Sequence, residues 1–403
     1  MTQLASSRPI PWNPAMILRR FPPMGVYETL FRFAEVTNKY MGDAGTHPWA
    51  QGFPLTSQIP GGPALPESIS ITSEDRMYPK ADGQMPLRQA IADYYRTVHG
   101  ANITYENVAV FAGGRPGIFA ILSFLLEDWS VTIEETEYTP YYDILKLLRR
   151  PHSLIASNPS NNFRPTLADH PEDDRVFLVK SNPCNPTGVT IAGDELQQMV
   201  EHYSASDRGA LFDEAYEWFT TGDPVSALSH VDDIEKTNLF VCGAATKGLQ
   251  VPGMRVGWVV SAKRHIEAFR NYSSFGMGGV SRASQLYVTE LLEQERVKQA
   301  MAAVGSFYTS QRNRYSEGFK KLGLELFTGD GGFYHWLRLP AGLTGDSFNE
   351  RLMKHDAAVM PGRLCDMARR GDNGLLGDLI RFSFGPLKAD SYENDMKIIS
   401  ACL

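Results

Sequence analysis

The chain has 403 residues and a formal net charge of −7, with 43% hydrophobic and 21% charged residues. This length exceeds what one small core needs and predicts a large domain with a smaller one. The negative charge argues against a nucleic-acid partner, because binding to phosphates relies on basic patches.

The cysteines and histidines indicate neither a disulfide framework nor a metal site. They lack the paired or ligand-like spacing of such sites: Cys184, Cys242, Cys365, Cys402, His47, His335 and His355. No uncharged apolar stretch is long enough to span a bilayer, and the N-terminus has no apolar signal core. We therefore expect a cytoplasmic protein with reduced thiols and no membrane partner.

The first fifty residues are rich in proline and aromatic residues around one amphipathic helix, predicted over residues 27–40. Such an arm makes a poor core of its own and is expected to pack on another body. From residue 83 the pattern becomes regular. Short β-like runs are predicted at residues 108–111, 131–133, 176–179, 210–212 and 239–242, and helices at residues 118–126, 141–148 and 194–203.

This alternation predicts an α/β fold with a mostly parallel sheet covered by helices on both faces, whose ligands bind beyond the carboxyl ends of the strands. A charged helix over residues 293–314 and strands within residues 331–340 and 380–385 predict a smaller α+β C-terminal domain. We expect an arm over residues 1–50, a large domain over 51–295 and a small domain over 296–403. The arm either stands apart or joins the small domain.

Lys247 is the first candidate for chemistry. It lies in a turn of small residues between the apolar runs 239–242 and 256–260, which should bury it, and Arg255 follows eight residues later. A confined site and a nearby cation favour the neutral, nucleophilic amine, as a Schiff base with a phosphorylated aldehyde requires. The alternative is a solvated lysine in a surface turn.

Polar side chains also follow the neighbouring strands. Asn185 lies in the turn Ser181–Gly188, where two prolines and a glycine fix the backbone. Asp213 ends the next strand, where a buried carboxylate needs a partner such as a protonated pyridine nitrogen. Tyr216 and Asn185 would then donate to an oxygen on the same ring. The alternative for Asp213 is a helix N-cap.

A glycine-rich turn, Ala112–Gly117, joins the strand at residues 108–111 to an apolar helix. Backbone N–H groups in such a turn, together with the N-terminus of the helix, can hold a phosphate. Glycine pairs are frequent in loops, so this signal is weak by itself.

Taken together, these segments resemble the fold-type I aminotransferases that use pyridoxal phosphate (PLP), which form the class I/II aminotransferase family. The matching segments occur in the family's order: Gln51–Pro54, Tyr78–Arg88, Asn182–Gly188, Asp213–Tyr216, Thr246–Lys247 with Arg255, Val359–Gly362 and Arg381–Phe384. The resemblance implies a seven-stranded type of sheet, PLP as cofactor and a homodimer with shared active sites. It implies transfer of an amino group from an L-amino acid to a 2-oxo acid, through a lysine-bound PLP aldimine and a pyridoxamine intermediate.

The resemblance also implies residue roles. Lys247 would be the aldimine lysine and proton shuttle, Asp213 would bind the pyridinium nitrogen, and Asn185 and Tyr216 would hold the ring hydroxyl. Arg381 would clamp the substrate carboxylate as a planar bidentate donor, and Gly52 would leave room beside it. The resemblance assigns five residues to the phosphate, the last of them from the other subunit: Gly114, Arg115, Thr246, Arg255 and Tyr78.

Some features depart from the family pattern. Ala244 replaces a common serine, and the loop 135–142 puts Thr139 where a ring-stacking aromatic is usual, so that Tyr138 is expected to stack instead. This loop is the sequence support for an alternative, a PLP-dependent lyase, decarboxylase or oxidase with the same site. A regulator would need a DNA-binding module, for which no segment remains. The loop Gly276–Ser281 is either a flexible surface loop or a segment that approaches the partner's cofactor.

The substrate side chain stays open. Two sets of residues are candidates for contacting it, cations for an acidic side chain and apolar groups for an aromatic or aliphatic one: Arg19, Arg20, Arg32 and Arg282, or Tyr27, Phe33, Trp49 and Phe275.

Overall fold

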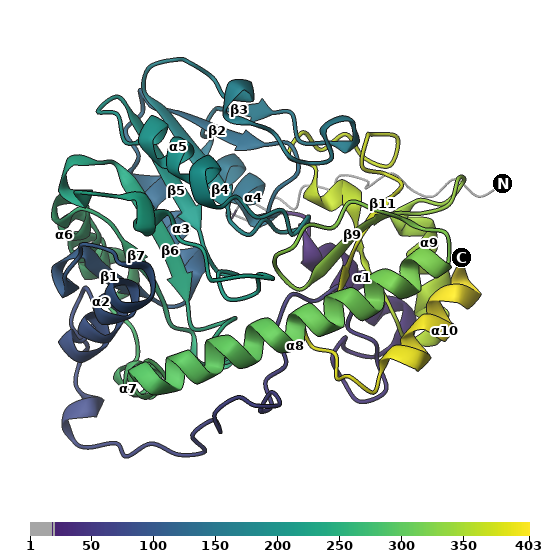
Figure 1. Cartoon of the computed structure of the whole chain (residues 1–403), viewed down its shortest axis with the longest axis horizontal. Helices are drawn as coiled ribbons and strands as arrows, with labels where there is room; N and C mark the ends of the chain where they lie inside the picture. The colour runs from purple at the N-terminus through teal and green to yellow at the C-terminus, as the bar shows by residue number, and fades with distance from the viewer. Residues whose placement is uncertain (1–17, 19–20) are drawn as a thin grey trace.

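Two bodies of unequal size are joined by one long helix, α8 (Gln294–Lys321) (Figure 1). The computed structural model describes residue 18 and residues 21–403. The larger body lies before α8 in the chain and the smaller body after it. The predicted domain boundary at residue 295 falls at the start of α8, and this helix continues unbroken from one body to the other. The division into an arm, a large domain and a small domain therefore stays a prediction.

The larger body is built on a seven-stranded sheet in the order β1-β7-β6-β5-β4-β2-β3. Its strands are β1 (Val108–Phe111), β2 (Ser130–Glu134), β3 (His152–Ile155), β4 (Val176–Ser181), β5 (Arg208–Asp213), β6 (Leu239–Ala244) and β7 (Gly257–Val260). Only β7 pairs antiparallel to its neighbours. The predicted mostly parallel sheet is therefore confirmed.

Helices cover both faces of this sheet: α2 (Met85–His99), α3 (Gly114–Phe124), α4 (Pro140–Leu148), α5 (Gly193–Tyr203), α6 (Lys263–Tyr272) and α7 (Arg282–Leu291). Alternate residues of one strand enter opposite cores. Val108 and Val110 pack in one apolar cluster, while Ala109 and Phe111 pack in the other. Both faces are buried, which explains why the strands read as continuous apolar runs.

The smaller body holds an antiparallel sheet in the order β10-β11-β9-β8. Its elements are β8 (Glu325–Leu326), β9 (Tyr334–Arg338), α9 (Gly345–Leu352), β10 (Met360–Pro361), β11 (Leu379–Ser383) and α10 (Tyr392–Cys402). The α+β character is as predicted. Strands β3, β8 and β10 were not predicted, because β8 and β10 have two residues each and β3 is largely unburied.

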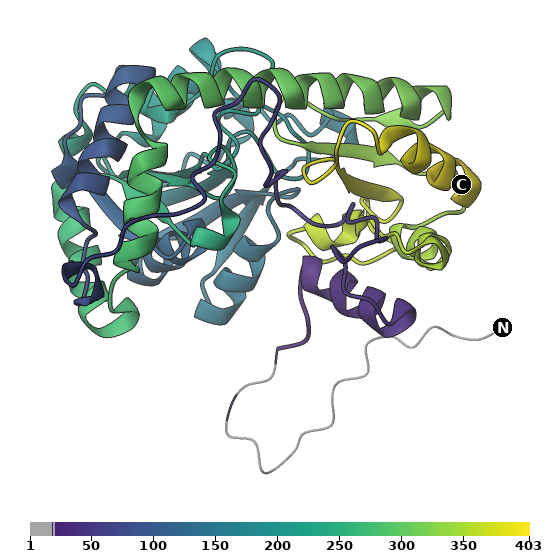
Figure 2. The same cartoon turned by 90° about the horizontal axis from the view of Figure 1, so that it is seen from below.

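Helix α1 (Val26–Thr37) packs against the smaller body (Figure 2). Its side chains Leu30 and Phe33 share an apolar cluster with Trp336 and Met360 of the small sheet. Among the two arrangements considered for the arm, this contact favours joining the small domain. Residues 1–17, 19 and 20 of the predicted arm lie outside the described residues, and so do the candidates Arg19 and Arg20.

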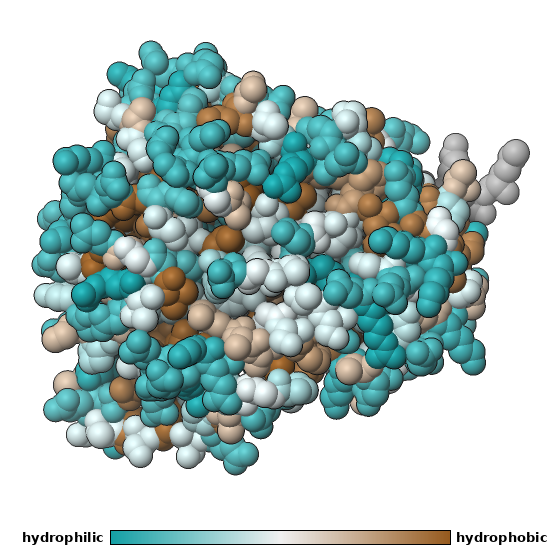
Figure 3. Space-filling view, in the orientation of Figure 1, coloured by the Kyte–Doolittle hydropathy of each residue, from teal (hydrophilic) through white to brown (hydrophobic). Residues whose placement is uncertain are grey.

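Hydrophilic side chains cover most of the molecular face in Figure 3, with smaller hydrophobic areas between them. Across residue 18 and residues 21–403, none of the helices has the length and apolar character needed to cross a membrane.

Candidate active site

Two adjoining cavities open at the carboxyl edge of the large sheet. The smaller has a volume of about 80 Å³ and is lined by Gly114, Arg115, Ile118, Tyr138, Ser181, Asn185, Asp213, Ala215, Tyr216, Ala244, Thr246, Lys247 and Arg255. Every predicted cofactor residue except Tyr78 belongs to this set. The larger cavity has a volume of about 540 Å³ and includes all three predicted substrate residues, Gly52, Asn185 and Arg381.

The topology explains this convergence. Asp213 is the last residue of β5, and Asn185 and Lys247 follow the ends of the neighbouring strands β4 and β6. These three strands run parallel, so their carboxyl ends meet at one edge. Residues that are far apart in the sequence thereby face one cavity.

Asp213 is a buried carboxylate, 8% exposed. Its Oδ2 accepts a hydrogen bond from the Tyr141 hydroxyl at 2.9 Å, and its Oδ1 accepts the Ala215 N–H at 3.3 Å. Burial raises the pKa of Asp213, and the Tyr141 hydrogen bond opposes that rise. Among the described residues, neither hydrogen-bond donor is a basic side chain, so a cation bound in the cavity would stabilise the charged form. The Ala215 contact belongs to a turn over residues 215–218, where no helix begins, so the structure does not support the N-cap alternative for Asp213.

Lys247 lies half-buried between the two cavities. Its amine donates a hydrogen bond to the Gly52 carbonyl and lies 5.5 Å from the ring centroid of Tyr216. Burial lowers the pKa of Lys247 to about 7, and the positive charges of Arg115 and Arg381 act in the same direction. Arg255, the cation predicted to lie near Lys247, lowers this pKa less than Arg115 and Arg381 do. A large fraction of the amine is thus neutral and nucleophilic near neutral pH.

The other end of the small cavity is formed by the start of α3. Within the described part of the chain no side chain caps this helix, so its first N–H groups are available to an anion. Gly113 has φ of 102°, and a Cβ there would lie 2.5 Å from an Arg255 guanidinium nitrogen, so glycine is needed for this approach. Arg255 is held by the carbonyls of Pro252 at 3.0 Å and Ala112 at 3.3 Å. The arrangement suits a phosphate.

Asn185 and Arg381 connect the two cavities. Arg381 is 4% exposed, donates to Asn185 Oδ1 at 2.9 Å and donates to the Ala50 carbonyl at 2.6 Å. Because the Asn185 oxygen is occupied, its amide nitrogen remains as a donor toward the cavity. Tyr216 and Tyr334 share a hydroxyl–hydroxyl hydrogen bond of 2.6 Å, so one of the two hydroxyl protons remains for another acceptor.

Tyr138, rather than Thr139, presents a ring to the small cavity. Tyr138 lines both cavities, whereas Thr139 lines only the larger one and donates to the Leu364 carbonyl at 3.1 Å. Tyr138 packs edge-on against Tyr141 with ring centroids 5.3 Å apart, and the exposed Arg115 lies beside it, with the pKa of Arg115 raised by this phenol. These contacts support the expectation that Tyr138 stacks on a bound ring.

Gly52 was predicted to leave room for the substrate, and Tyr78 was predicted to act from the other subunit. A Cβ at Gly52 would lie 2.4 Å from the Tyr334 hydroxyl, so the missing side chain makes room for Tyr334 as well as for a substrate. Tyr78 is 93% exposed and lines neither cavity. If Tyr78 acts at an active site, that site belongs to another copy of the chain.

Of the side chains considered for substrate specificity, Tyr27 lines the larger cavity. The others in the described part of the chain do not line it: Phe33 and Trp49 are buried in apolar clusters, Phe275 is 75% exposed, Arg32 pairs with Glu35, and Arg282 lies 3.7 Å from Asp75.

Sequence reasoning missed Tyr141, Tyr334 and Ser181 as residues of the site. Tyr141 is the first residue of the predicted helix 141–148 and the second residue of α4, and this position just after a strand end was the available signal. Tyr334 follows a glycine pair at the start of β9, where no local pattern shows that it reaches Tyr216. Ser181 begins the predicted turn Ser181–Gly188, and no sequence pattern shows that its side chain lines the small cavity.

Comparisons with known proteins agree with this geometry. Residues 46–387 match the family model for aminotransferase class I and II. The LL-diaminopimelate aminotransferase of Moorella thermoacetica is 27% identical over 72% of this chain and 75% of its own length. The aspartate aminotransferase of Pyrococcus horikoshii is 25% identical over 68% of this chain and 72% of its own.

Solved structures show the same fold. The aspartate aminotransferase of Thermus thermophilus with maleate superposes with a TM-score of 0.79 at 20% identity, over 95% of this chain and 97% of that one. An aminotransferase from Mycobacterium tuberculosis gives a TM-score of 0.77 at 23% identity, over 94% and 96% of the two chains. The chain belongs to the class I and II aminotransferase family, and it is a PLP-dependent enzyme that transfers amino groups.

The residues of the small cavity fit this cofactor. Asp213 is a buried carboxylate whose described hydrogen bonds leave room for a cationic partner, as a protonated pyridine nitrogen would be. The uncapped start of α3 with Arg255 provides donors for a phosphate, and Lys247 provides a nucleophilic amine between these two ends. When bound, the cofactor supplies an electron sink for negative charge that develops on the substrate.

Proposed function

We propose that the protein moves the amino group of an L-amino acid to a 2-oxo acid at the cavity around Lys247. The observation that supports this most directly is the position of the Lys247 amine. It lies at the junction of a small cavity suited to the cofactor and a larger cleft that contains Arg381. A proton carrier at this junction reaches both bound molecules.

The proposed roles follow from the contacts. Arg381 binds the substrate carboxylate through its planar guanidinium, which Asn185 and the Ala50 carbonyl hold in place. Lys247 would hold the cofactor aldehyde when no substrate is present, and its neutral amine would take the proton from the substrate Cα. Asp213 would hold the ring nitrogen, and Tyr216 and Asn185 would donate to the ring oxygen.

The phosphate is assigned to donors at the opposite end of the small cavity. These are the backbone N–H groups of Gly114 and Arg115, the hydroxyl of Thr246 and the guanidinium of Arg255. Ala244 lines the same cavity without a hydroxyl, so the charge of Arg255 contributes more than it would beside a serine.

The test of the reaction uses the purified, PLP-loaded enzyme and a panel of amino acids. We expect each accepted amino acid to yield its 2-oxo acid, and a second 2-oxo acid to gain the amino group in equal amount. Release of ammonia, carbon dioxide or a cleaved side chain without formation of a new amino acid would contradict this proposal. It would instead support the alternative of a lyase, decarboxylase or oxidase.

We further propose that the enzyme is a cytoplasmic homodimer whose two active sites share residues. The support is a pair of neighbouring exposed side chains: Tyr78 is 93% exposed and Met77 is 58% exposed. Gly279 brings the loop 276–281 against this segment, since a Cβ there would lie 2.5 Å from a Pro79 ring carbon. Clustered exposed apolar groups of this kind mark an association surface. The four buried, free cysteines are compatible with a reducing compartment.

A mixing experiment tests the shared sites. K247A and Y78A homodimers are each expected to have low activity. A hybrid dimer contains one K247A subunit and one Y78A subunit. If Tyr78 serves the partner's cavity, one active site of the hybrid has both defects and the other is intact. Activity above the sum of the parents after mixing and reassembly supports sharing. If mass measurement verifies the hybrid dimers but their activity does not exceed the sum of the two parents, the sites are not shared.

A further inference from the structure

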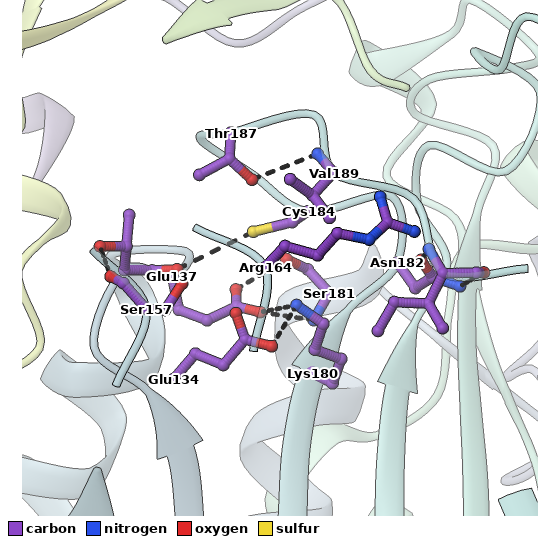
Figure 4. A network of polar contacts seen from close by, with 12 residues as sticks. Glu134, Glu137, Ser157, Arg164, Lys180, Ser181, Asn182, Cys184, Thr187 and Val189 are labelled. Carbon is purple, nitrogen blue, oxygen red and sulfur yellow. Dashed lines mark hydrogen bonds and ion pairs between the residues drawn. The ribbon is translucent and has the colours of Figure 1, made fainter. Parts of the chain in front are cut away.

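Three charged side chains are buried beneath the active site without being part of it. Lys180 lies on β4, Glu134 ends β2, and Glu137 lies in the loop after β2; none is more than 1% exposed. The Lys180 amine lies 2.6 Å from Glu134 and 3.6 Å from Glu137, between the two carboxylates (Figure 4). Buried charges are costly unless they are paired, so this cluster needs a structural or functional reason.

Glu137 has three additional donors around it. Its Oε1 accepts the Ser181 N–H at 2.9 Å. Its Oε2 accepts the Ser181 hydroxyl at 2.6 Å and the Tyr138 N–H at 2.8 Å. Burial raises the pKa of Glu137 to about 7, while the charge of Lys180 and the donors of Ser181 oppose that rise. Because all its partners donate, the charged carboxylate matches this environment better than an amide does.

The contacts continue from Ser181 into the active site. The Ser181 hydroxyl oxygen accepts the Asn185 N–H at 3.1 Å. The Asn185 side chain in turn receives a hydrogen bond from Arg381 at 2.9 Å. One carboxylate is therefore linked to Tyr138 on one side of the small cavity. On the other side it is linked, through Ser181, to Asn185 and Arg381.

We propose that Glu137 is a positioning residue that aligns Tyr138 with the Asn185–Arg381 pair. This inference rests on the proposed function, because it assigns Tyr138 to the cofactor ring and Arg381 to the substrate carboxylate. Lys180 favours the charged form of Glu137, and this form accepts all three hydrogen bonds at once. Loss of this form frees the loop 181–185 to shift relative to Tyr138, and a shift of this kind lowers the affinity for both cofactor and substrate.

Glu134 offers a matched comparison within the same cluster. It is equally buried and pairs with the same lysine, but no other described residue donates a hydrogen bond to its carboxylate. If the cluster had only a structural role, E134Q and E137Q would have similar effects on stability and on the active site. A positioning role predicts that only E137Q disturbs the active site, because only Glu137 contacts Ser181 and Tyr138.

The experiment measures three quantities for wild type, E137Q, E137D and E134Q: the melting temperature of the cofactor-free protein, the Kd for PLP and the KM for an accepted amino acid. We expect E137Q to raise both Kd and KM about tenfold, as for the loss of one hydrogen bond to a charged group. E137D keeps the charge and should restore part of the loss. E134Q should lower the melting temperature while both constants stay within about twofold of wild type.

Equal effects of E134Q and E137Q on Kd and KM, at matched loss of melting temperature, would overturn the proposal. S181A provides a second route if E137Q does not fold, because it removes the hydroxyl link and keeps the Ser181 N–H. An unchanged KM and Kd in S181A would also overturn the proposal. A wild-type enzyme without amino transfer would refute the proposed function instead, and the Kd for PLP would still test the link from Glu137 to Tyr138.

Discussion

The two ends of the active-site cleft are constructed differently. At the cofactor end, Asp213 and Lys247 are fixed at the ends of neighbouring parallel strands. At the substrate end, Gly52, Tyr334 and Arg381 come from a loop and from two strands of the smaller sheet. The first end is held by one continuous hydrogen-bonded ladder. The second depends on the relative position of two bodies, so changes there should alter binding more than the chemical step.

The largest effect is expected from K247A, which removes the proton carrier at the junction of the two ends. Amino transfer should fall about 1,000-fold or more, because general base catalysis and the covalent link to the cofactor are both lost. The rate of 2-oxo acid formation measures it. K263A is the control, since Lys263 forms an exposed pair with Glu106 away from the cavities. Retained turnover in K247A would remove this lysine from the chemistry.

D213N should reduce kcat by about 100-fold, with little change in KM for the amino acid. An amide cannot keep a proton on the pyridine nitrogen, so the electron sink weakens. Y141F removes only the hydrogen bond to Asp213 and should cost about fivefold in kcat. Steady-state kinetics of the two variants test this order. A larger loss in Y141F than in D213N would contradict the assignment.

R381K tests the substrate end. Lysine keeps the positive charge but loses the planar fork, and it cannot reach both Asn185 and the Ala50 carbonyl as arginine does. We expect KM for the amino acid to rise about 30-fold and kcat to change less, because a ground-state binding contact is lost. If kcat fell by as large a factor as KM rose, substrate binding by Arg381 would not be separable from the chemical step at Lys247.

The last prediction concerns the pH dependence of Lys247. The pKa of Lys247 is about 7, so its neutral fraction rises about tenfold from pH 6 to pH 8 and then levels off. An exposed lysine, whose amine stays charged until far higher pH, becomes more reactive by about 100-fold over the same range. The rate of PLP labelling of the cofactor-free enzyme, trapped by borohydride and mapped by peptide, distinguishes the two. If the labelling rate of Lys247 rose about 100-fold from pH 6 to pH 8 without a plateau, burial would not lower the pKa of this lysine.

Sequence patterns predicted the fold class and most of the residues that line the small cavity. Strands that are buried on both faces read as apolar runs, and side chains that follow their carboxyl ends must meet at one edge when the strands are parallel. Asp213, Asn185 and Lys247 were found in this way. Tyr141 was missed because its link to Asp213 runs from a helix start to a different strand.

The substrate end required the tertiary structure. Nothing local to β9 shows that Tyr334 meets Tyr216 across 118 positions of sequence, or that Glu137 reaches Ser181. Such contacts depend on how helices, sheet and the smaller body pack, which is a three-dimensional property of the chain. The sequence alone determined which residues are expected to carry the chemistry and which strand edge they share. Packing decided how Tyr334 meets Tyr216, where Arg381 is held and which buried carboxylate contacts Ser181.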